Sequence, residues 1–213
     1  DFPLIGGLGS ERQRIEDELL SAVKTSDEHL TELAQHLIVA GGKRLRPVLT
    51  MVAGALGDGT ISQDVVRGGV SCELVHLGSL YHDDVMDESP TRRGVETVNA
   101  KWGNLQAILA GDFLLARASE IAASLGTEIA ALLAKTIAWL CEGQIEELRT
   151  TYDPTRTNES YFASIRGKTA SLYGTSAQVG GIVTGLDRPV IDALTEYGDS
   201  FGMLFQIVDD VLD

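Results

Sequence analysis

Two short acidic stretches share one spacing, DDxxD, in "LYHDDVMDES" and in "VDDVLD" at the end of the sequence. The two triplets are Asp83, Asp84 and Asp87, and Asp209, Asp210 and Asp213. Repulsion between carboxylates one helical turn apart costs about 0.2–0.5 kcal/mol on an exposed helix, and burial makes it larger. A divalent cation reverses this effect, and hard oxygen ligands suit Mg²⁺, which is often shared with substrate phosphates. The stretches therefore predict two facing halves of a magnesium site around a diphosphate.

The ordinary alternative for a single DDxxD pattern is a solvated acidic face. Here the second copy directly follows the apolar run "GMLFQIV". That context makes a purely surface role a weaker explanation and favours the metal site.

The stretch from Gln63 to Asp87 shows how one helix could carry both core and site. Its apolar residues recur at spacings of three and four and predict a packing face formed by Val70, Leu74, Leu77, Tyr81 and Val85. At about 100° per residue, His76, Asp83 and Asp87 fall within about 20° of one line on a different face. A satisfied core histidine is the alternative for His76, but this alignment favours the site.

Basic motifs could supply the other half of a phosphate site. "GGKRLRP" places Lys43, Arg44 and Arg46 after a flexible Gly-Gly turn, "TRRG" follows the first acidic stretch, and "RGKTASL" adds a cation and a hydroxyl. Each alone is more commonly a surface loop or helix end. Together, in a chain with 17 lysines and arginines against 31 acids, they predict an anion site.

Helical periodicity extends over nearly the whole chain, and no sustained period-2 alternation supports a sheet. A "TSDE" capping signal opens the second helix, and Pro189 suits a first helical position. We therefore expect one all-α domain over residues 1–213. The expected helices are Ser10–Lys24, Ser26–Ala40, Leu45–Leu56, Gln63–Asp87, Leu105–Leu125, Thr127–Arg149, Asn158–Thr184 and Pro189–Asp213.

Composition narrows the class of protein. Hydrophobic residues make up 44% and charged residues 23%, and no apolar run reaches the roughly 18–20 residues of a membrane span. The net charge of −14 argues against nucleic-acid binding, and two cysteines do not form a disulfide framework. We expect a soluble, cytoplasmic protein. Because the sequence begins without methionine and stops within a helical pattern, we expect the domain to lack its C-terminal part.

The ordered motifs "GGKRLRP", "ELVHLGSLYHDDVMD", "TRRG", "NAKWGNLQAILAGDFLLA", "GKTASL" and "FQIVDDVLD" resemble those of trans-isoprenyl diphosphate synthases, the polyprenyl synthetases. The resemblance runs from about Gly41 to the end of the sequence. It implies an isoprenoid-synthase-type helical bundle around a deep central cavity, usually homodimeric. It also implies a prenyltransferase that condenses isopentenyl diphosphate with an allylic diphosphate.

The resemblance further implies roles for individual residues. Those that would hold isopentenyl diphosphate are Lys43, Arg46, His76 and Arg93. Those that would contact the allylic diphosphate are Arg92, Lys168, Thr169 and Gln206. The six aspartates of the two triplets, including Asp213, would bind it through Mg²⁺, and the resemblance makes Asp83, Asp84, Asp87, Arg92, Lys168, Asp209 and Asp210 the catalytic set.

Product length in the family depends on what lies below the first acidic cluster. Ser79 lies one turn before Asp83, and Gly78 is beside it. Small residues there leave the cavity floor open, which favours a geranylgeranyl or longer product. Close helix packing is the alternative for both residues, and Tyr81 should point elsewhere.

Three other functions are less consistent with the motifs. A class I terpene cyclase would not need "GGKRLRP". A non-catalytic subunit of a heteromeric synthase would tend to lose its acidic clusters. A calcium-binding acidic protein would explain neither the arginines nor Gln206.

Overall fold

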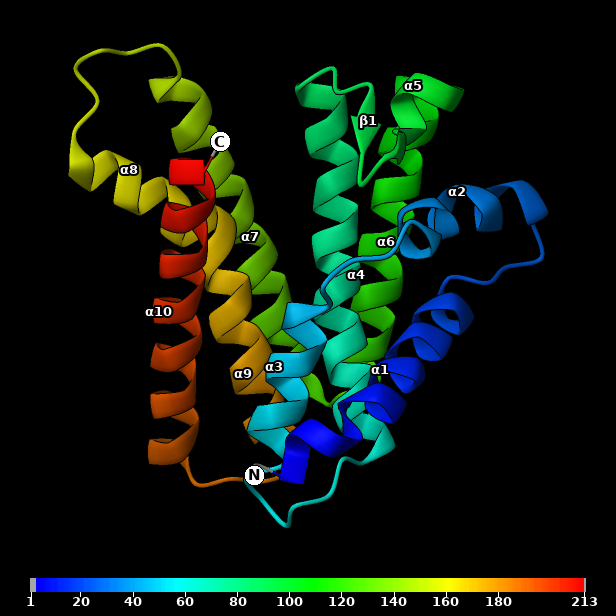
Figure 1. Ribbon diagram of the computed structural model, residues 1–213, viewed down its shortest axis with the longest axis vertical. Coiled ribbons are helices and arrows are strands. Elements are labelled where there is room, and N and C mark those ends of the chain that lie inside the picture. Colours follow the sequence, from blue (N-terminus) through cyan, green and yellow to red (C-terminus); the bar gives the residue numbers. More distant parts are fainter. Residues whose placement is uncertain (1–2, 213) are drawn as a thin grey trace.

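The computed structural model describes residues 3–212, with side chains from residue 9 onward. The chain is overwhelmingly helical, as predicted, and its helices follow one another through short turns (Figure 1). The elements are α1 (Pro3–Ala22), α2 (Glu28–Val39), α3 (Leu45–Gly54), α4 (Gln63–Met86), β1 (Thr91–Arg92), β2 (Val95–Glu96), α5 (Val98–Trp102), α6 (Asn104–Leu125), α7 (Thr127–Thr150), α8 (Asn158–Ile165), the π-helix η1 (Arg166–Ala170), α9 (Ser171–Val183) and α10 (Arg188–Leu212).

Helix α4 is the central element. It packs against α1, α3, α6 and α9, and Val70, Leu74, Leu77 and Tyr81 of its predicted packing face are buried, while Val85 is partly buried. In Figure 1, α4 and α6 lie on one side of the view, and α7, α9 and α10 lie on the other. The two groups of helices carry different motifs: the first acidic stretch lies at the end of α4, and Asp209 and Asp210 lie on α10.

Side-chain caps set where several helices begin. The carboxylate of Asp27 accepts hydrogen bonds from the backbone N–H groups of His29 and Leu30, each at 3.0 Å, so α2 starts two residues later than predicted. Ser62 caps α4 through the N–H of Val65 in the same way. These bonds satisfy N–H groups that the helix itself leaves unpaired.

The structure corrects the sequence prediction in two details and adds a third. The helix expected over Asn158–Thr184 is divided by η1, where the backbone widens to a π turn. The "TRRG" motif lies on a two-stranded antiparallel ribbon, in which Arg92 pairs with Val95. Pro189 is the second residue of α10, because this helix begins at Arg188.

Glycines allow two pairs of helices to approach very closely. A Cβ at Gly143 of α7 would lie 2.3 Å from the backbone nitrogen of Lys168, and one at Gly198 of α10 would lie 2.6 Å from the carbonyl oxygen of Tyr173. These contacts seat η1 on α7 and α9 on α10. None of the helices in residues 3–212 is both long enough and apolar enough to cross a membrane.

Candidate active site

A cavity of about 750 Å³ collects side chains from motifs that are far apart in the sequence. Its walls come from the loop before α3 and from α3, α4, α6, α7, η1, α9 and α10. The predicted site residues that line it are Lys43, Arg46, His76, Ser79, Asp83, Arg92, Arg93, Lys168, Thr169, Gln206 and Asp209. Folding thus brings acidic, basic and polar groups to one space.

The three acids of the first cluster occupy different environments. Asp83 lines the cavity, Asp84 is buried, and Asp87 is exposed where α4 ends. Burial raises the pKa of Asp83, and Asp87 raises it further, whereas Lys168 counteracts both. Burial also raises the pKa of Asp84, opposed by Arg92, whose Nε lies 2.5 Å from the Asp84 carboxylate. In this structure the carboxylate of Asp84 therefore forms an ion pair with Arg92.

The second cluster lies on α10. Asp209 and Asp210 are both exposed, and Asp209 lines the cavity. The Asp210 carboxylate accepts hydrogen bonds from the hydroxyl of Tyr161 at 2.6 Å and from the amide of Gln206 at 2.7 Å. Burial and the neighbouring Asp210 raise the pKa of Tyr161 to about 12, so this phenol stays a donor. Asp213 lies outside the described residues.

Both clusters reach the same cavity from different helices, since Asp83 belongs to α4 and Asp209 to α10. Over residues 3–212, no group of three or more His, Cys, Asp or Glu side chains converges on a single metal position. The acids nevertheless supply only carboxylate oxygens, the donor type that Mg²⁺ prefers. Mg²⁺ binding therefore stays a prediction, one with which the chemistry of the donors is compatible.

Arg46 is a largely buried cation that lines the cavity. Its side chain is 8% exposed, it lies with its guanidinium carbon 4.5 Å from the centroid of the Tyr173 ring, and its Nε is buried without a hydrogen-bond partner. A buried N–H without a partner is costly unless a ligand accepts from it. Lys43 lies near the same place, with Nζ 5.8 Å from the centroid of the Phe205 ring.

Positive charge is concentrated around His76. Burial, followed by the charges of Arg46, Arg93, Arg92 and Arg44, lowers the pKa of His76 well below its usual range. Burial, with a further contribution from the neighbouring arginines, lowers the pKa of Arg93, although Glu73 opposes the shift. His76 is therefore neutral at physiological pH, and an anionic ligand would relieve the repulsion among the arginines.

The π-helix places Lys168 and Thr169. Lys168 Nζ donates to Glu147 at 2.5 Å, and the hydroxyl of Thr169 donates to Gln206 Oε1 at 2.8 Å. Gln206 in turn donates to Asp210, so a chain of hydrogen bonds joins η1 to the second acidic cluster. Short π-helical segments frequently occur at functional sites because they redirect side chains.

The two residues predicted to set product length have different surroundings. Ser79 lines the cavity, and its hydroxyl donates to the carbonyl of His76. Gly78 does not line it, because a Cβ at Gly78 would lie 3.0 Å from the carbonyl oxygen of Gly111 and 3.1 Å from Leu115 Cγ. Gly78 thus has the close helix packing that the sequence left open for it, and its role in product length stays a prediction. Tyr81 points away, as expected, and donates to the carbonyl of Leu33.

Sequence reasoning missed several residues of the site. Glu73, Tyr173 and Phe205 line the cavity, and Glu147 holds Lys168 from α7. Glu73 could have been found, because it precedes His76 by three residues and so shares its helical face. Glu147 had no comparable signal, because its role depends on how α7 crosses η1.

The remainder of the cavity is largely apolar. Side chains of α4, α6 and α7 continue the lining beyond the charged groups. They are Leu80, Val85, Met86, Ile108, Leu140, Ile145 and Leu148. The cavity therefore combines a charged region with walls suited to a hydrocarbon.

Comparison with known sequences identifies close relatives of the chain. It is 40% identical to a nonaprenyl diphosphate synthase of Mycobacterium tuberculosis over 200 residues, which cover 94% of this chain and 60% of that protein. It is 41% identical to heptaprenyl diphosphate synthase component 2 of Geobacillus stearothermophilus over 207 residues, covering 97% of this chain and 64% of that protein. The chain thus spans less than two thirds of either relative.

Solved structures agree with the sequence comparison. The decaprenyl diphosphate synthase of Rhodobacter capsulatus superimposes with a TM-score of 0.92 at 36% identity, over 99% of this chain and 65% of that one. The structure is therefore the predicted isoprenoid-synthase helical fold. A family model for polyprenyl synthetase matches residues 27–213. The chain belongs to the polyprenyl synthetase family.

Proposed function

We propose that this protein is a trans-prenyltransferase that condenses isopentenyl diphosphate with an allylic prenyl diphosphate. The observation that carries the proposal is that basic residues, among them Arg46, line the same cavity as the acids Asp83 and Asp209. One cavity thus offers cations for one diphosphate and carboxylates for a metal-bound second one. Its apolar walls suit the prenyl chains.

The cationic wall is the proposed site for the diphosphate of isopentenyl diphosphate. Lys43, Arg46 and Arg93 supply positive charge there, and neutral His76 can donate a hydrogen bond without adding to the repulsion. Charge-assisted hydrogen bonds from arginine to phosphate are among the stronger polar contacts in proteins.

The acidic residues are the proposed site for Mg²⁺ and, through it, for the allylic diphosphate. Asp83, Asp87, Asp209 and Asp210 would hold Mg²⁺, with Asp84 joining if it releases Arg92, and Asp213 completing the second triplet. Asp83 suits this role, since burial and Asp87 both disfavour its charge in the absence of a cation. When bound, Mg²⁺ stabilises negative charge that develops on the departing diphosphate. Lys168, Thr169, Gln206 and Arg92 would contact the same group.

The proposed reaction has three parts. The C–O bond of the allylic diphosphate breaks, and the cationic side chains stabilise the leaving group as its charge develops. The double bond of isopentenyl diphosphate then attacks the allylic cation, forming a C–C bond. A proton finally leaves the new cation and passes to the released diphosphate, so no covalent enzyme nucleophile takes part.

We propose a product of geranylgeranyl length or longer. Ser79 lines the cavity one turn below Asp83, where a bulky side chain would close it. The relatives named above are nona-, hepta- and decaprenyl diphosphate synthases, which supports a long product, while other relatives are named as geranylgeranyl and short-chain synthases.

We also propose a homodimer formed through α6. Leu105 is 79% exposed and Leu109 is 65% exposed on adjacent turns of this helix. Apolar residues that are exposed together on one helix are candidates for an interface when they form a contiguous patch. Because one relative is named as a component of its synthase, a heteromeric assembly with a different subunit is the second candidate. Sedimentation of the purified protein separates these assemblies, and a monomer that gains activity only with another subunit would contradict the homodimer.

The proposed activity is tested by incubating the protein with labelled isopentenyl diphosphate, Mg²⁺ and, separately, geranyl, farnesyl or geranylgeranyl diphosphate. Elongated products are expected with at least one primer, and none is expected in excess EDTA. A double variant, Asp83→Asn with Asp209→Asn, is the matched control. Absence of elongation with every primer would contradict the proposal. The cytoplasmic location expected from the sequence is a separate prediction for cell fractionation.

A further inference from the structure

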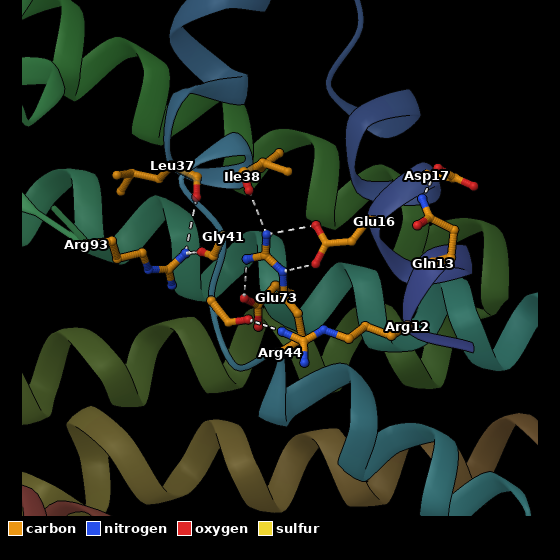
Figure 2. Close-up of polar contacts among 11 residues, drawn as sticks. Arg12, Gln13, Glu16, Asp17, Leu37, Ile38, Gly41, Arg44, Glu73 and Arg93 are labelled. Atoms are coloured by element: carbon orange, nitrogen blue, oxygen red, sulfur yellow. Dashed lines mark hydrogen bonds and ion pairs between the residues drawn. The ribbon is translucent and has the colours of Figure 1, made fainter. Parts of the chain in front are cut away.

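Arg44, the middle cation of "GGKRLRP", is fully buried and is bound by protein groups rather than held ready for a ligand. Its Nε and Nη2 donate to the two carboxylate oxygens of Glu16 at 2.8 and 2.9 Å, and its Nη1 donates to Glu73 Oε1 at 3.1 Å (Figure 2). Its Nη2 also donates to the carbonyl of Ile38 at 2.8 Å. Glu16 belongs to α1 and Glu73 to α4, so this guanidinium joins two helices beneath the loop that carries Lys43.

The backbone of the same loop is unusual. Arg44 has φ 52° and ψ 38°, the left-handed conformation that residues with a side chain seldom adopt, and Gly41 and Gly42 also have positive φ. Such a backbone persists only where surrounding contacts hold it. The four hydrogen bonds of the Arg44 guanidinium supply part of that constraint.

Two more arginines hold the carbonyl groups of the loop. Arg12 of α1 donates to the carbonyl of Gly42 at 2.7 Å, and Arg93 donates to the carbonyls of Gly41 and Leu37 (Figure 2). A Cβ at Gly42 would lie 2.9 Å from Arg93 Nη1, so a side chain at this position would displace the guanidinium. The path of the loop is thus specified from α1 on one side and from the "TRRG" ribbon on the other.

We propose that Glu16, Arg44 and Glu73 form a positioning cluster that sets the loop conformation in which Lys43 and Arg46 receive the diphosphate of isopentenyl diphosphate. This inference rests on the proposed function. It assigns a role to α1, since Glu16 precedes residues 27–213, the part of the chain matched by the family model. None of the three residues acts on substrate in this proposal; Arg44 acts through the loop.

The shape of the arginine matters as much as its charge. A guanidinium can bond one carboxylate in a bidentate manner and still reach a second, whereas an ammonium cannot reproduce this fork. Glu73 is 2% exposed, and its Oε2 has no hydrogen-bond partner, so it depends on Arg44 for its one hydrogen bond. Both Arg44→Lys and Glu16→Gln should therefore loosen the loop. Neither change should move the first acidic triplet, Asp83, Asp84 and Asp87.

The experiment compares steady-state kinetics of the wild type, Glu16→Gln and Arg44→Lys. We expect the KM for isopentenyl diphosphate to rise about tenfold in both variants, with kcat and the KM for the allylic diphosphate changed less than twofold. The matched control is Arg14→Gln, because Arg14 also lies on α1 and bonds Glu11, Gln63 and the carbonyl of Ile61, all away from the loop. Its KM values should equal those of the wild type.

Thermal unfolding of all four proteins separates positioning from loss of structure. An unchanged KM for isopentenyl diphosphate in Glu16→Gln, or an equal rise in Arg14→Gln, would overturn the inference while leaving the proposed function intact. If the wild type itself shows no condensation, the proposed function fails. Calorimetric titration with inorganic pyrophosphate then tests the positioning cluster independently of activity. Weaker binding in Glu16→Gln but not in Arg14→Gln supports the cluster, and equal binding in all proteins overturns it.

Discussion

The guanidinium of Arg92 is bound to the buried carboxylate of Asp84, with 2.5 Å between Arg92 Nε and Asp84 Oδ1. The side chain of Asp84 is 2% exposed and that of Arg92 is 29% exposed. The ion pair therefore links the buried side of α4 to the partly exposed strand β1. One residue of the DDxxD pattern therefore holds the "TRRG" ribbon in place.

Arg92→Gln should destabilise the fold as well as weaken diphosphate binding. It leaves the Asp84 carboxylate buried without its charged partner, and a buried group left unpaired costs about 1–3 kcal/mol. Urea unfolding at pH 7 measures the change in free energy of unfolding. The control is Arg188→Gln, which breaks the exposed Arg188–Glu128 pair and should have little effect. Equal losses in the two variants would show that Asp84 does not depend on Arg92.

His76 should contribute a pH dependence to stability. Because the folded protein holds this imidazole neutral while the unfolded chain binds a proton near the ordinary pKa of about 6.5, wild-type stability should fall as the pH drops from 7.5 to 5. His76→Gln keeps a neutral hydrogen-bonding group and removes this linkage. Between pH 7.5 and 5, the wild type should therefore lose about 2 kcal/mol more unfolding free energy than the variant does. Parallel pH profiles of the two proteins would mean that His76 is not held neutral.

Ser79→Phe should shorten the product, because an aromatic ring at this lining position fills the cavity one turn below Asp83. Chromatography of the dephosphorylated products measures their length. Gly78→Ala is the neighbouring control: its new methyl group would press on the carbonyl of Gly111 and on Leu115 of α6, outside the cavity. That change should alter the thermal midpoint and leave the product distribution as in the wild type. Unchanged length in Ser79→Phe would remove Ser79 from the floor.

Asp209 and Asp210 should differ in their effect on turnover. Asp209 lines the cavity, whereas both carboxylate oxygens of Asp210 already accept hydrogen bonds, from Tyr161 and Gln206. Asp209→Asn should lower kcat by about 10²-fold, the usual effect of removing one group that stabilises developing charge, and should raise the Mg²⁺ concentration needed for half-maximal rate. Asp210→Asn should have a smaller effect on both.

Initial rates over a Mg²⁺ titration measure these effects. Asp192→Asn, an exposed acid at the other end of α10, is the control and should behave as the wild type. A larger loss in Asp210→Asn than in Asp209→Asn would reverse the assignment of the two acids.

The sequence predicted the helices and the grouping of the motifs because both follow from local patterns. Apolar spacing in Gln63–Asp87 correctly marked Val70, Leu74, Leu77 and Tyr81 as core residues, although α4 is buried on most of its surface between Val65 and Gly78. The same phase placed His76 and Asp83 together at the cavity. Such patterns carry information about one helix at a time.

The sequence could not predict contacts that depend on how two helices cross. The exclusion of Gly78 from the cavity arises from the approach of α6, and the pairing of Lys168 with Glu147 arises from the contact of η1 with α7. The contact between Arg44 and Glu16 spans 28 residues and has no periodic signature. The π turn itself left no composition signal, since "RGKTA" is compatible with an ordinary helix.

The wide turn at Arg166–Ala170 also joins α8 to α9, two helices that point in different directions in Figure 1. A π turn holds about one residue more than an α turn, so α9 is rotated by about 100° from the phase that α8 would have given it. Tyr161 can therefore face Asp210 while Tyr173, twelve residues later, is buried beside Arg46. Deleting one residue within this turn would restore a uniform α-helical pitch. Either α8 or α9 would then turn a different face toward the helices that pack against it. The orientation of each helix thus depends on a residue count as well as on the glycines that allow close packing there.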